Sequence, residues 1–135
     1  MRPTRFLLVT CATLAGCGAP THERPTAVGM PHFTSEFLAG GWVLAGASCD
    51  SDSGVIYRRD GRWIALGGGG TWQVKKGRLV ETVVEQEDAA GEMRRLPVPV
   101  QYADQVEVIG PDAFIARRGD GSIRQLHRCD RTATR

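Results

Sequence analysis

Residues 54–66 read Gly-Val-Ile-Tyr-Arg-Arg-Asp-Gly-Arg-Trp-Ile-Ala-Leu, two short apolar runs on either side of Asp60-Gly61. β-Branched and aromatic residues favour strands, and Asp followed by Gly accepts the backbone angles of a tight primed turn. In the second run, strand alternation places Trp63 and Ala65 together on one face. The stretch therefore predicts a β-hairpin with one face turned toward a core.

The same pattern of short strands and turn residues continues along most of the chain. Runs rich in Val, Ile, Trp and Tyr alternate with Gly, Asp and Pro, and no convincing helix interrupts them. A series of hairpins without a crossover is best satisfied by a meander that curls on itself and removes its exposed edges. We expect an all-β fold, an antiparallel up-and-down meander that closes into a small barrel or half-barrel. The predicted strands cover residues 41–47, 54–59, 62–66, 71–75, 78–85, 95–102, 105–109, 113–117 and 122–129, which makes nine, or eight if two of them merge.

Prolines and glycines predict two irregular places in this sheet. Pro97 and Pro99 each remove a backbone donor, which suits an edge or a bulge better than a central strand. The run Gly67-Gly68-Gly69-Gly70 predicts a bend or bulge where the backbone passes close to a bulky side chain, Trp63 or Trp72. It does not resemble a phosphate-binding loop, because a strand follows it and no lysine is suitably placed.

The start of the first strand carries a short motif. Gly40-Gly41-Trp42 resembles the Gly-x-Trp start of lipocalin-like barrels, in which the tryptophan plugs the closed end. The resemblance implies a lipocalin-like barrel with Trp42 at one end. The alternative is an ordinary core tryptophan.

The N-terminus has the order of an export signal. Arg2 and Arg5 precede an apolar stretch at 6–14, and Leu14-Ala15-Gly16-Cys17 follows. This resembles the lipobox of bacterial lipoproteins and implies cleavage before Cys17, with lipid attached to its thiol. The alternative is a cysteine that happens to follow an ordinary cleavable signal. Gly18, where an aspartate often marks inner-membrane retention in that family, favours the outer membrane, facing the periplasm.

The domain organisation follows from that motif and from the strands. We expect a lipoprotein signal peptide at 1–16, a lipidated N-terminus and flexible tether at 17–35, a β-barrel domain at 36–130 and a disordered tail at 131–135. His22 and His32 lie in the tether and are expected to be exposed to solvent.

Cys49 and Cys129 remain as a pair once Cys11 is removed with the signal and Cys17 is lipidated. In an exported, oxidising environment a disulfide is the expected state. A simple meander brings both to the same end only with an odd number of strands. Nine strands, or eight with one irregular crossing, would satisfy this, whereas eight regular strands would put Cys129 at the opposite end. A redox or metal site is the alternative, but it lacks a Cys-x-x-Cys spacing.

Charge and composition exclude some classes of partner. Loss of residues 1–16 takes away Arg2 and Arg5, so the 17 basic residues become 15 against 15 acidic ones. Nucleic-acid binding needs a clustered basic surplus, and only short pairs such as Arg58-Arg59 are present. We therefore expect the membrane as a partner through the N-terminal lipid, a periplasmic protein as a candidate second partner, and no nucleic acid.

No motif of catalysis stands out. The segment Asp50-Ser51-Asp52-Ser53-Gly54 has the alternating carboxylates of a calcium loop but lacks the later ligands, so a turn rich in Asp and Ser is the favoured interpretation. We find no nucleophile elbow, no paired-carboxylate spacing and no cofactor fingerprint. The sequence predicts a protein that is not an enzyme, with no catalytic residues, no cofactor and no metal site.

These features together predict a lipid-anchored protein of the bacterial cell envelope whose small barrel is a binding or interaction module. Short strands would leave an interior nearly filled by side chains, so a large hydrophobic ligand is not expected. The alternative is a periplasmic inhibitor of a protease or lysozyme. Residues 38–44 followed by Cys49 resemble the opening of bacterial alkaline-metalloprotease inhibitors, and Ser53-Gly54-Val55-Ile56-Tyr57 is similar to the Ser-Gly-x-x-Tyr element of lysozyme-inhibitor lipoproteins.

Overall fold

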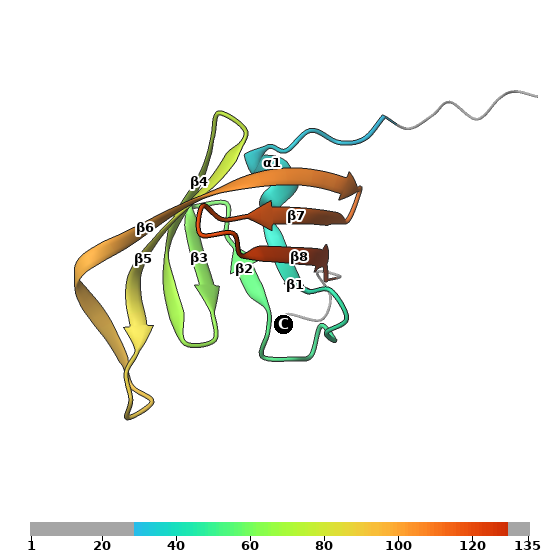
Figure 1. The fold of residues 1–135 in the computed structure, drawn as a ribbon. Coiled ribbons are helices and arrows are strands. Elements are labelled where there is room, and N and C mark those ends of the chain that lie inside the picture. Colours follow the sequence, from blue (N-terminus) through green and yellow to red (C-terminus); the bar gives the residue numbers. More distant parts are fainter. Residues whose placement is uncertain (1–28, 130–135) are drawn as a thin grey trace, which may run out of the picture.

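The computed structural model describes residues 29–129 and contains one short helix and eight strands (Figure 1). The predicted signal peptide, Cys11, Cys17, His22 and the predicted tail at 131–135 lie outside these residues. The elements are α1 (Ser35–Leu38), β1 (Gly40–Leu44), β2 (Val55–Tyr57), β3 (Arg62–Ala65), β4 (Gly68–Lys75), β5 (Arg78–Glu87), β6 (Met93–Gly110), β7 (Ala113–Arg117) and β8 (Ile123–Arg128). Within 29–129, no helix is long and apolar enough to cross a bilayer.

The strands form a closed antiparallel barrel in which each pairs with the next along the chain. The barrel closes where β1 pairs with β8, with Trp42 opposite Arg128 and Leu44 opposite Leu126. This confirms the predicted up-and-down meander and its closure. The count is eight because β6 runs without a break through the two predicted strands at 95–102 and 105–109.

β6 is long because it serves two neighbours in succession. Its first part pairs with β5, and its last part, from Gln105, pairs with β7. The pairing with β5 shifts register where Val83 opposes Val100 but Glu85 opposes Arg95, so Pro97 and Pro99 fall in the irregular segment between. The predicted bulge is therefore present, and it places the two residues that cannot donate a backbone hydrogen bond outside the regular ladder.

The hairpin turns differ from the prediction in their backbone angles. At the Asp60-Gly61 turn only the glycine adopts a positive φ, of 82°, so this turn is not a two-residue primed turn. The turn at Lys76-Gly77 has that character, since φ is 52° at Lys76 and 73° at Gly77.

Gly68 to Gly70 lie in β4, and at Gly70 the neighbouring strand and an indole leave no room for a side chain. A Cβ at Gly70 would lie 1.9 Å from the backbone oxygen of Thr82 and 3.1 Å from Nε1 of Trp63. The β4–β5 register shifts between Gly69 and Gly70. Of the two tryptophans that the sequence left open, Trp63 is therefore the one that packs against the glycine run.

One end of the barrel interior is filled with aromatic rings and covered by α1. Trp42 packs against Phe37 and Phe114, with ring centroids 5.4 and 4.7 Å away, and its indole N–H donates to the backbone oxygen of Leu38 at 2.7 Å. Phe33 packs on Phe114 as well, so the packed structure begins before residue 36, while His32 is exposed as expected. We call this the closed end.

Candidate functional site

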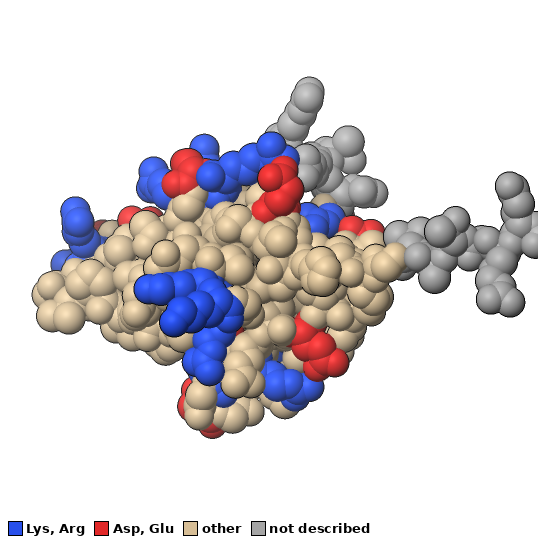
Figure 2. All heavy atoms as spheres, turned by 90° about the horizontal axis from the view of Figure 1, so that it is seen from above, with Lys and Arg blue, Asp and Glu red and all other residues tan. Residues whose placement is uncertain are grey.

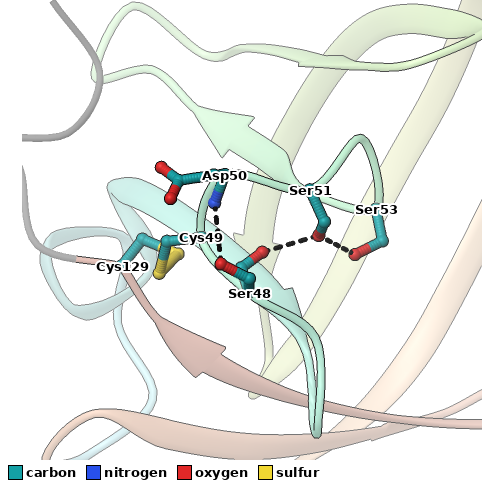
Figure 3. Close-up of a disulfide and its surroundings, with 6 residues drawn as sticks. All are labelled: Ser48, Cys49, Asp50, Ser51, Ser53 and Cys129. Carbon is teal, nitrogen blue, oxygen red and sulfur yellow. Dashed lines mark hydrogen bonds between the residues drawn. A yellow bond between two sulfur atoms is a disulfide. The ribbon is translucent and has the colours of Figure 1, made fainter.

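Cys49 and Cys129 form a disulfide that holds the β1–β2 loop, residues 45–54, against the barrel (Figure 3). Cys129 lies beside the start of β1, where its backbone N–H donates to the oxygen of Gly41 at 2.9 Å. With eight strands, Cys129 is at the opposite end from the point where β1 ends, as the sequence argument foresaw for a regular meander. The disulfide forms because the loop turns back along the outer face of β1, a path that a strand count alone does not predict.

The returning loop changes the outer face of β1. Val43, next in the chain to the inward-facing Trp42, points outward but is only 2% exposed. A Cβ at Gly54, in the returning part of the loop, would lie 3.4 Å from the Val43 side chain. The loop therefore covers an apolar residue that a bare strand would expose to water.

The serines of this loop bond to the loop itself. Oγ of Ser51 donates to the backbone oxygen of Ser48 at 2.6 Å and lies 2.7 Å from Oγ of Ser53, while the backbone N–H of Asp50 donates to Oγ of Ser48 at 3.3 Å (Figure 3). Across the described part of the chain, no three His, Cys, Asp or Glu side chains gather as a metal site would require. The segment 50–54 is a hydrogen-bonded turn, the interpretation that the sequence favoured.

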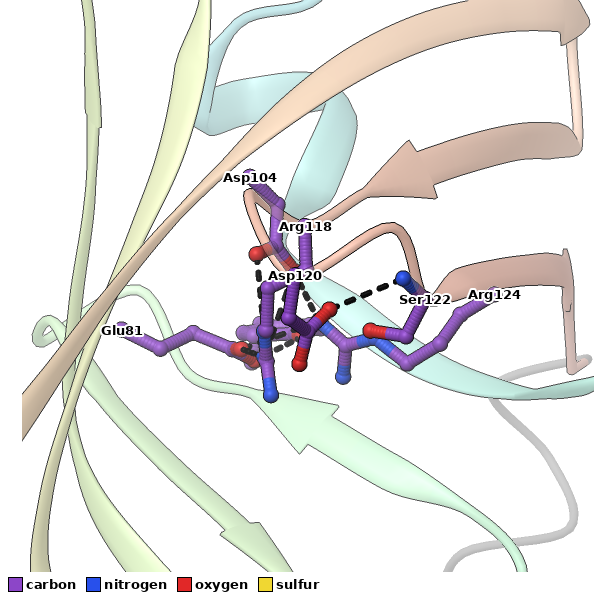
Figure 4. Close-up of polar contacts among 7 residues, drawn as sticks. Glu81, Asp104, Arg118, Asp120, Ser122 and Arg124 are labelled. Carbon is purple, nitrogen blue, oxygen red and sulfur yellow. Dashed lines mark hydrogen bonds and ion pairs between the residues drawn. The ribbon is translucent and has the colours of Figure 1, made fainter.

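Four charged side chains meet inside the barrel, away from the closed end. Glu81 comes from β5, Asp104 from β6, Arg118 from the turn after β7 and Arg124 from β8 (Figure 4). We call these four residues the ion-pair cluster. Strand alternation explains the positions of three of them, because Glu81, Asp104 and Arg124 each lie two places from a core residue of the same strand, namely Leu79, Val106 and Leu126.

Every carboxylate oxygen of the ion-pair cluster accepts a hydrogen bond. Asp104 accepts from Nε and Nη2 of Arg118 at 3.0 and 3.3 Å and from Nη2 of Arg124 at 2.6 Å. Oε2 of Glu81 accepts from Nη2 of Arg124 at 2.9 Å and from Nη2 of Arg118 at 3.4 Å. Buried carboxylates are tolerated only when charge and hydrogen bonds both compensate for lost water, and this cluster supplies both.

Tyr57 completes the cluster from β2. Its hydroxyl donates to Oε1 of Glu81 at 2.5 Å, and the residue is 1% exposed. Burial and then the Glu81 carboxylate raise the pKa of Tyr57 well above its usual value, because both disfavour a second negative charge. Burial lowers the pKa of Arg124, but the carboxylates and Tyr57 outweigh it and raise that pKa overall, so the guanidinium stays charged.

A cavity of about 270 Å³ lies next to the ion-pair cluster. Arg118, Arg124 and Glu81 line it on the charged side, and Tyr102 packs flat against Arg118, 3.9 Å from the ring centroid to the guanidinium carbon. The remaining lining residues are Leu44, Ser53, Gly54, Val55, Trp63, Ala65, Val83 and Leu126. The barrel interior is thus filled at the closed end but hollow beside the cluster, whereas the sequence predicted an interior that is nearly filled.

A second hollow, of about 330 Å³, lies on the outside of the barrel beneath the disulfide-held loop. Cys49, Ile56, Ile64 and Leu66 are among its lining residues, and Leu66 is 70% exposed. The face drawn in Figure 2 shows basic side chains in small groups, some of them beside acidic side chains, with uncharged surface between the groups.

The sequence predicted the two cysteines of the disulfide but not the ion-pair cluster. Part of the signal was present in the strand alternation, since Glu81 shares a strand face with Leu79 and Arg124 shares one with Leu126, but Asp104 falls between the two predicted strands that the structure joins into β6. Taken alone, a charged residue on the inward face of a predicted strand suggests that the inward and outward faces of that strand have been assigned the wrong way round. Only the barrel brings three strands and a turn together so that the charges compensate. Comparisons of the chain with family models, curated proteins and solved structures found no match.

Proposed function

We propose that this protein is a lipid-anchored, non-enzymatic binding module of the bacterial cell envelope, and that its binding site is the hollow half of the barrel. The observation that carries the proposal is the cavity of about 270 Å³ beside the ion-pair cluster. Its volume is near the lower end of the range for small-molecule sites, about 300–1,000 Å³, and apolar walls with a few placed polar groups are typical of them.

The chemistry of the cavity favours binding over catalysis. Its carboxylate, Glu81, is held by Tyr57 and two arginines, and the raised pKa of Tyr57 keeps the phenol protonated. A general base must be able to hydrogen-bond the proton that it removes from the substrate, and both oxygens of Glu81 already accept hydrogen bonds within the cluster. A carboxylate held by two cations and a protonated phenol are better suited to fixing a ligand's position.

The anchor is supported by the resemblance of residues 14–17 to a lipobox and by the Cys49–Cys129 disulfide, a bond that is typical of exported proteins. Cys17 would carry the lipid, and the chain up to Gly29 would join it to the barrel. Two or three acyl chains hold a protein on a membrane stably, since each buried methylene contributes about 0.8 kcal/mol. Because residue 18 is Gly and not Asp, the proposed location of the protein is the outer membrane, facing the periplasm.

Intact-mass measurement of protein extracted from membranes tests the anchor. We expect a chain that begins at Cys17, carries the added mass of acyl groups and has lost two hydrogens to the Cys49–Cys129 disulfide. An unmodified chain that still includes residues 1–16 would contradict the proposal.

A cavity-filling substitution tests the binding site. Ala65 lines the cavity and packs against the core, so Ala65→Phe would occupy the space without removing a charge. In native mass spectrometry and thermal unfolding, we expect small molecules to bind the full-length protein and not this variant. If no compound of a chemically diverse set binds, or if every compound that binds does so equally to the parent and to Ala65→Phe, the cavity is not the binding site. Leu96→Phe, at a half-buried position outside the cavity lining, is the control.

The disulfide-held loop supports a second candidate, a periplasmic inhibitor of a protease or lysozyme. A loop already fixed in one conformation loses little entropy on binding, which favours tight association with an enzyme. Within Ser53-Gly54-Val55-Ile56-Tyr57, however, Tyr57 is buried against Glu81, so only part of that element reaches the surface. The disulfide also joins residues 80 positions apart, unlike the local disulfide of the protease inhibitors. Assays against lysozyme and secreted metalloproteases decide this, and no inhibition at stoichiometric concentration would discard the candidate.

A further inference from the structure

The two arginines of the ion-pair cluster are more accessible than its two carboxylates. The side chains of Glu81 and Asp104 are 6% and 1% exposed, whereas those of Arg118 and Arg124 are 24% and 32% exposed. The four formal charges sum to zero, but the cations and the anions are not equally accessible. The part of the cluster that a molecule in the cavity can reach is therefore mainly cationic, with two arginines and one carboxylate among the lining residues.

Both arginines also retain donors for such a molecule. Arg118 uses Nε and Nη2 toward the carboxylates, and Arg124 uses Nη2 alone. Among residues 29–129, Nη1 of each arginine has no hydrogen-bond partner. Neither of these atoms is buried away from solvent, because Nε1 of Trp63 is the only buried side-chain nitrogen or oxygen without a partner in that range.

The geometry of these donors is fixed before any ligand arrives. Asp104 holds Arg118 through two of its nitrogens, and the Tyr102 ring packs against the guanidinium at 3.9 Å. A fixed guanidinium with a free N–H group suits an oxyanion such as a carboxylate, because the charge-assisted hydrogen bond is strong and its donor is already in place. Leu44, Val83 and Leu126 give the same cavity an apolar wall.

We propose that the cavity binds a small organic anion, with its carboxylate on the free donors of Arg118 and Arg124 and its short apolar part against Leu44, Val83 and Leu126. This inference rests on the proposed binding function and adds the chemical class of the ligand. The volume of about 270 Å³ limits the apolar part to a short chain or a single ring system.

Octanoate and 1-octanol form a matched pair of probes, since they have the same chain length and only one carries a charge. Full-length protein with Cys17→Ser, which cannot be lipidated, allows work without detergent. We expect calorimetry to give at least tenfold tighter binding for octanoate than for octanol. We also expect octanoate to shift the NMR signals of the Trp63 indole N–H and the Arg118 side chain.

Two further substitutions locate the effect. Arg118→Gln is expected to reduce octanoate affinity at least tenfold, while Arg117→Gln, which removes the same charge from an exposed neighbour, leaves it within twofold. Should Arg118→Gln unfold, the salt dependence of the parent protein replaces it: octanoate affinity falls with ionic strength and octanol affinity does not.

The outcomes separate this inference from the proposed function. Equal affinity for octanoate and octanol, or equal loss in the Arg118 and Arg117 variants, would overturn the anion preference and leave the cavity as a binding site. Failure of both probes, together with a negative screen against Ala65→Phe, would overturn both proposals.

Discussion

The guanidinium of Arg128 lies over the indole ring of Trp42, 4.2 Å from the ring centroid, at the closed end of the barrel. The two residues face each other where β8 meets β1. Nη1 and Nη2 of Arg128 donate to the backbone oxygens of Ala39 and Phe37 at 3.2 and 2.5 Å, and Nε donates to Asp112 at 3.1 Å. One side chain thus connects the last strand, the first strand and the residues around α1.

Arg128→Ala is expected to lower the free energy of unfolding by about 3 kcal/mol, since it removes both the cation–π contact and charged hydrogen bonds to buried carbonyls. Urea unfolding followed by tryptophan fluorescence measures this. Arg128→Lys keeps the charge but fewer donors, so its loss should be intermediate. Equal stability of the alanine variant and the parent would show that this contact does not hold the closed end.

Removal of the disulfide by Cys49→Ser with Cys129→Ser should destabilise the barrel by about 4 to 5 kcal/mol in the chain-entropy model, because the bond closes a loop of 80 residues in the unfolded chain. Release of the β1–β2 loop would also expose Val43. Urea unfolding with and without a reductant tests this: the parent should lose stability on reduction and the double variant should not. A parent that is unaffected by reduction would contradict the expectation.

Gly70 and Gly69 offer a matched pair of alanine substitutions. At Gly70 the new Cβ would meet the backbone oxygen of Thr82 at 1.9 Å, which cannot move without breaking the β4–β5 pairing. At Gly69 it would meet Oε1 of Glu85 at 2.7 Å, the far end of a flexible side chain. We expect Gly70→Ala to cost about 3 kcal/mol or more and Gly69→Ala about 1 kcal/mol or less, measured by thermal unfolding. A larger loss of stability for Gly69→Ala than for Gly70→Ala would contradict the close approach of Gly70 to the backbone of Thr82.

Tyr57 should make the fold sensitive to alkali. Because folding raises the pKa of Tyr57 above its unfolded value of about 10, the folded state favours the protonated phenol. The stability from this group is fully present below pH of about 10 and is lost as the pH rises toward the folded-state pKa. Urea unfolding at a series of pH values from about 8 to 11 should show this loss.

Tyr57→Phe separates the phenol from other alkaline effects. At neutral pH it should cost about 1 to 3 kcal/mol, since Oε1 of Glu81 loses its donor inside the barrel. Above pH of about 10 its stability should fall less steeply than that of the parent. Parallel slopes for the two proteins would mean that Tyr57 does not titrate differently in the folded and unfolded states.

The sequence by itself determined the class of fold, because that depends on local properties. Alternation placed Trp63 and Ala65 inward, glycines and prolines located turns and the bulge at Pro97, and two cysteines predicted the disulfide. Each of these is a matter of backbone preference or of residue count, and each can be read over a few neighbouring positions.

Only the tertiary structure decided the strand count, the path of the β1–β2 loop and the ion-pair cluster. β6 is one strand because β7 takes over as its partner where the β5 pairing ends, and nothing near residue 104 signals that exchange. Glu81, Asp104, Arg118 and Arg124 are compensated by partners up to 43 positions away. The cost of burying a charge depends on what surrounds it in space, and closure of the barrel alone brings those partners together.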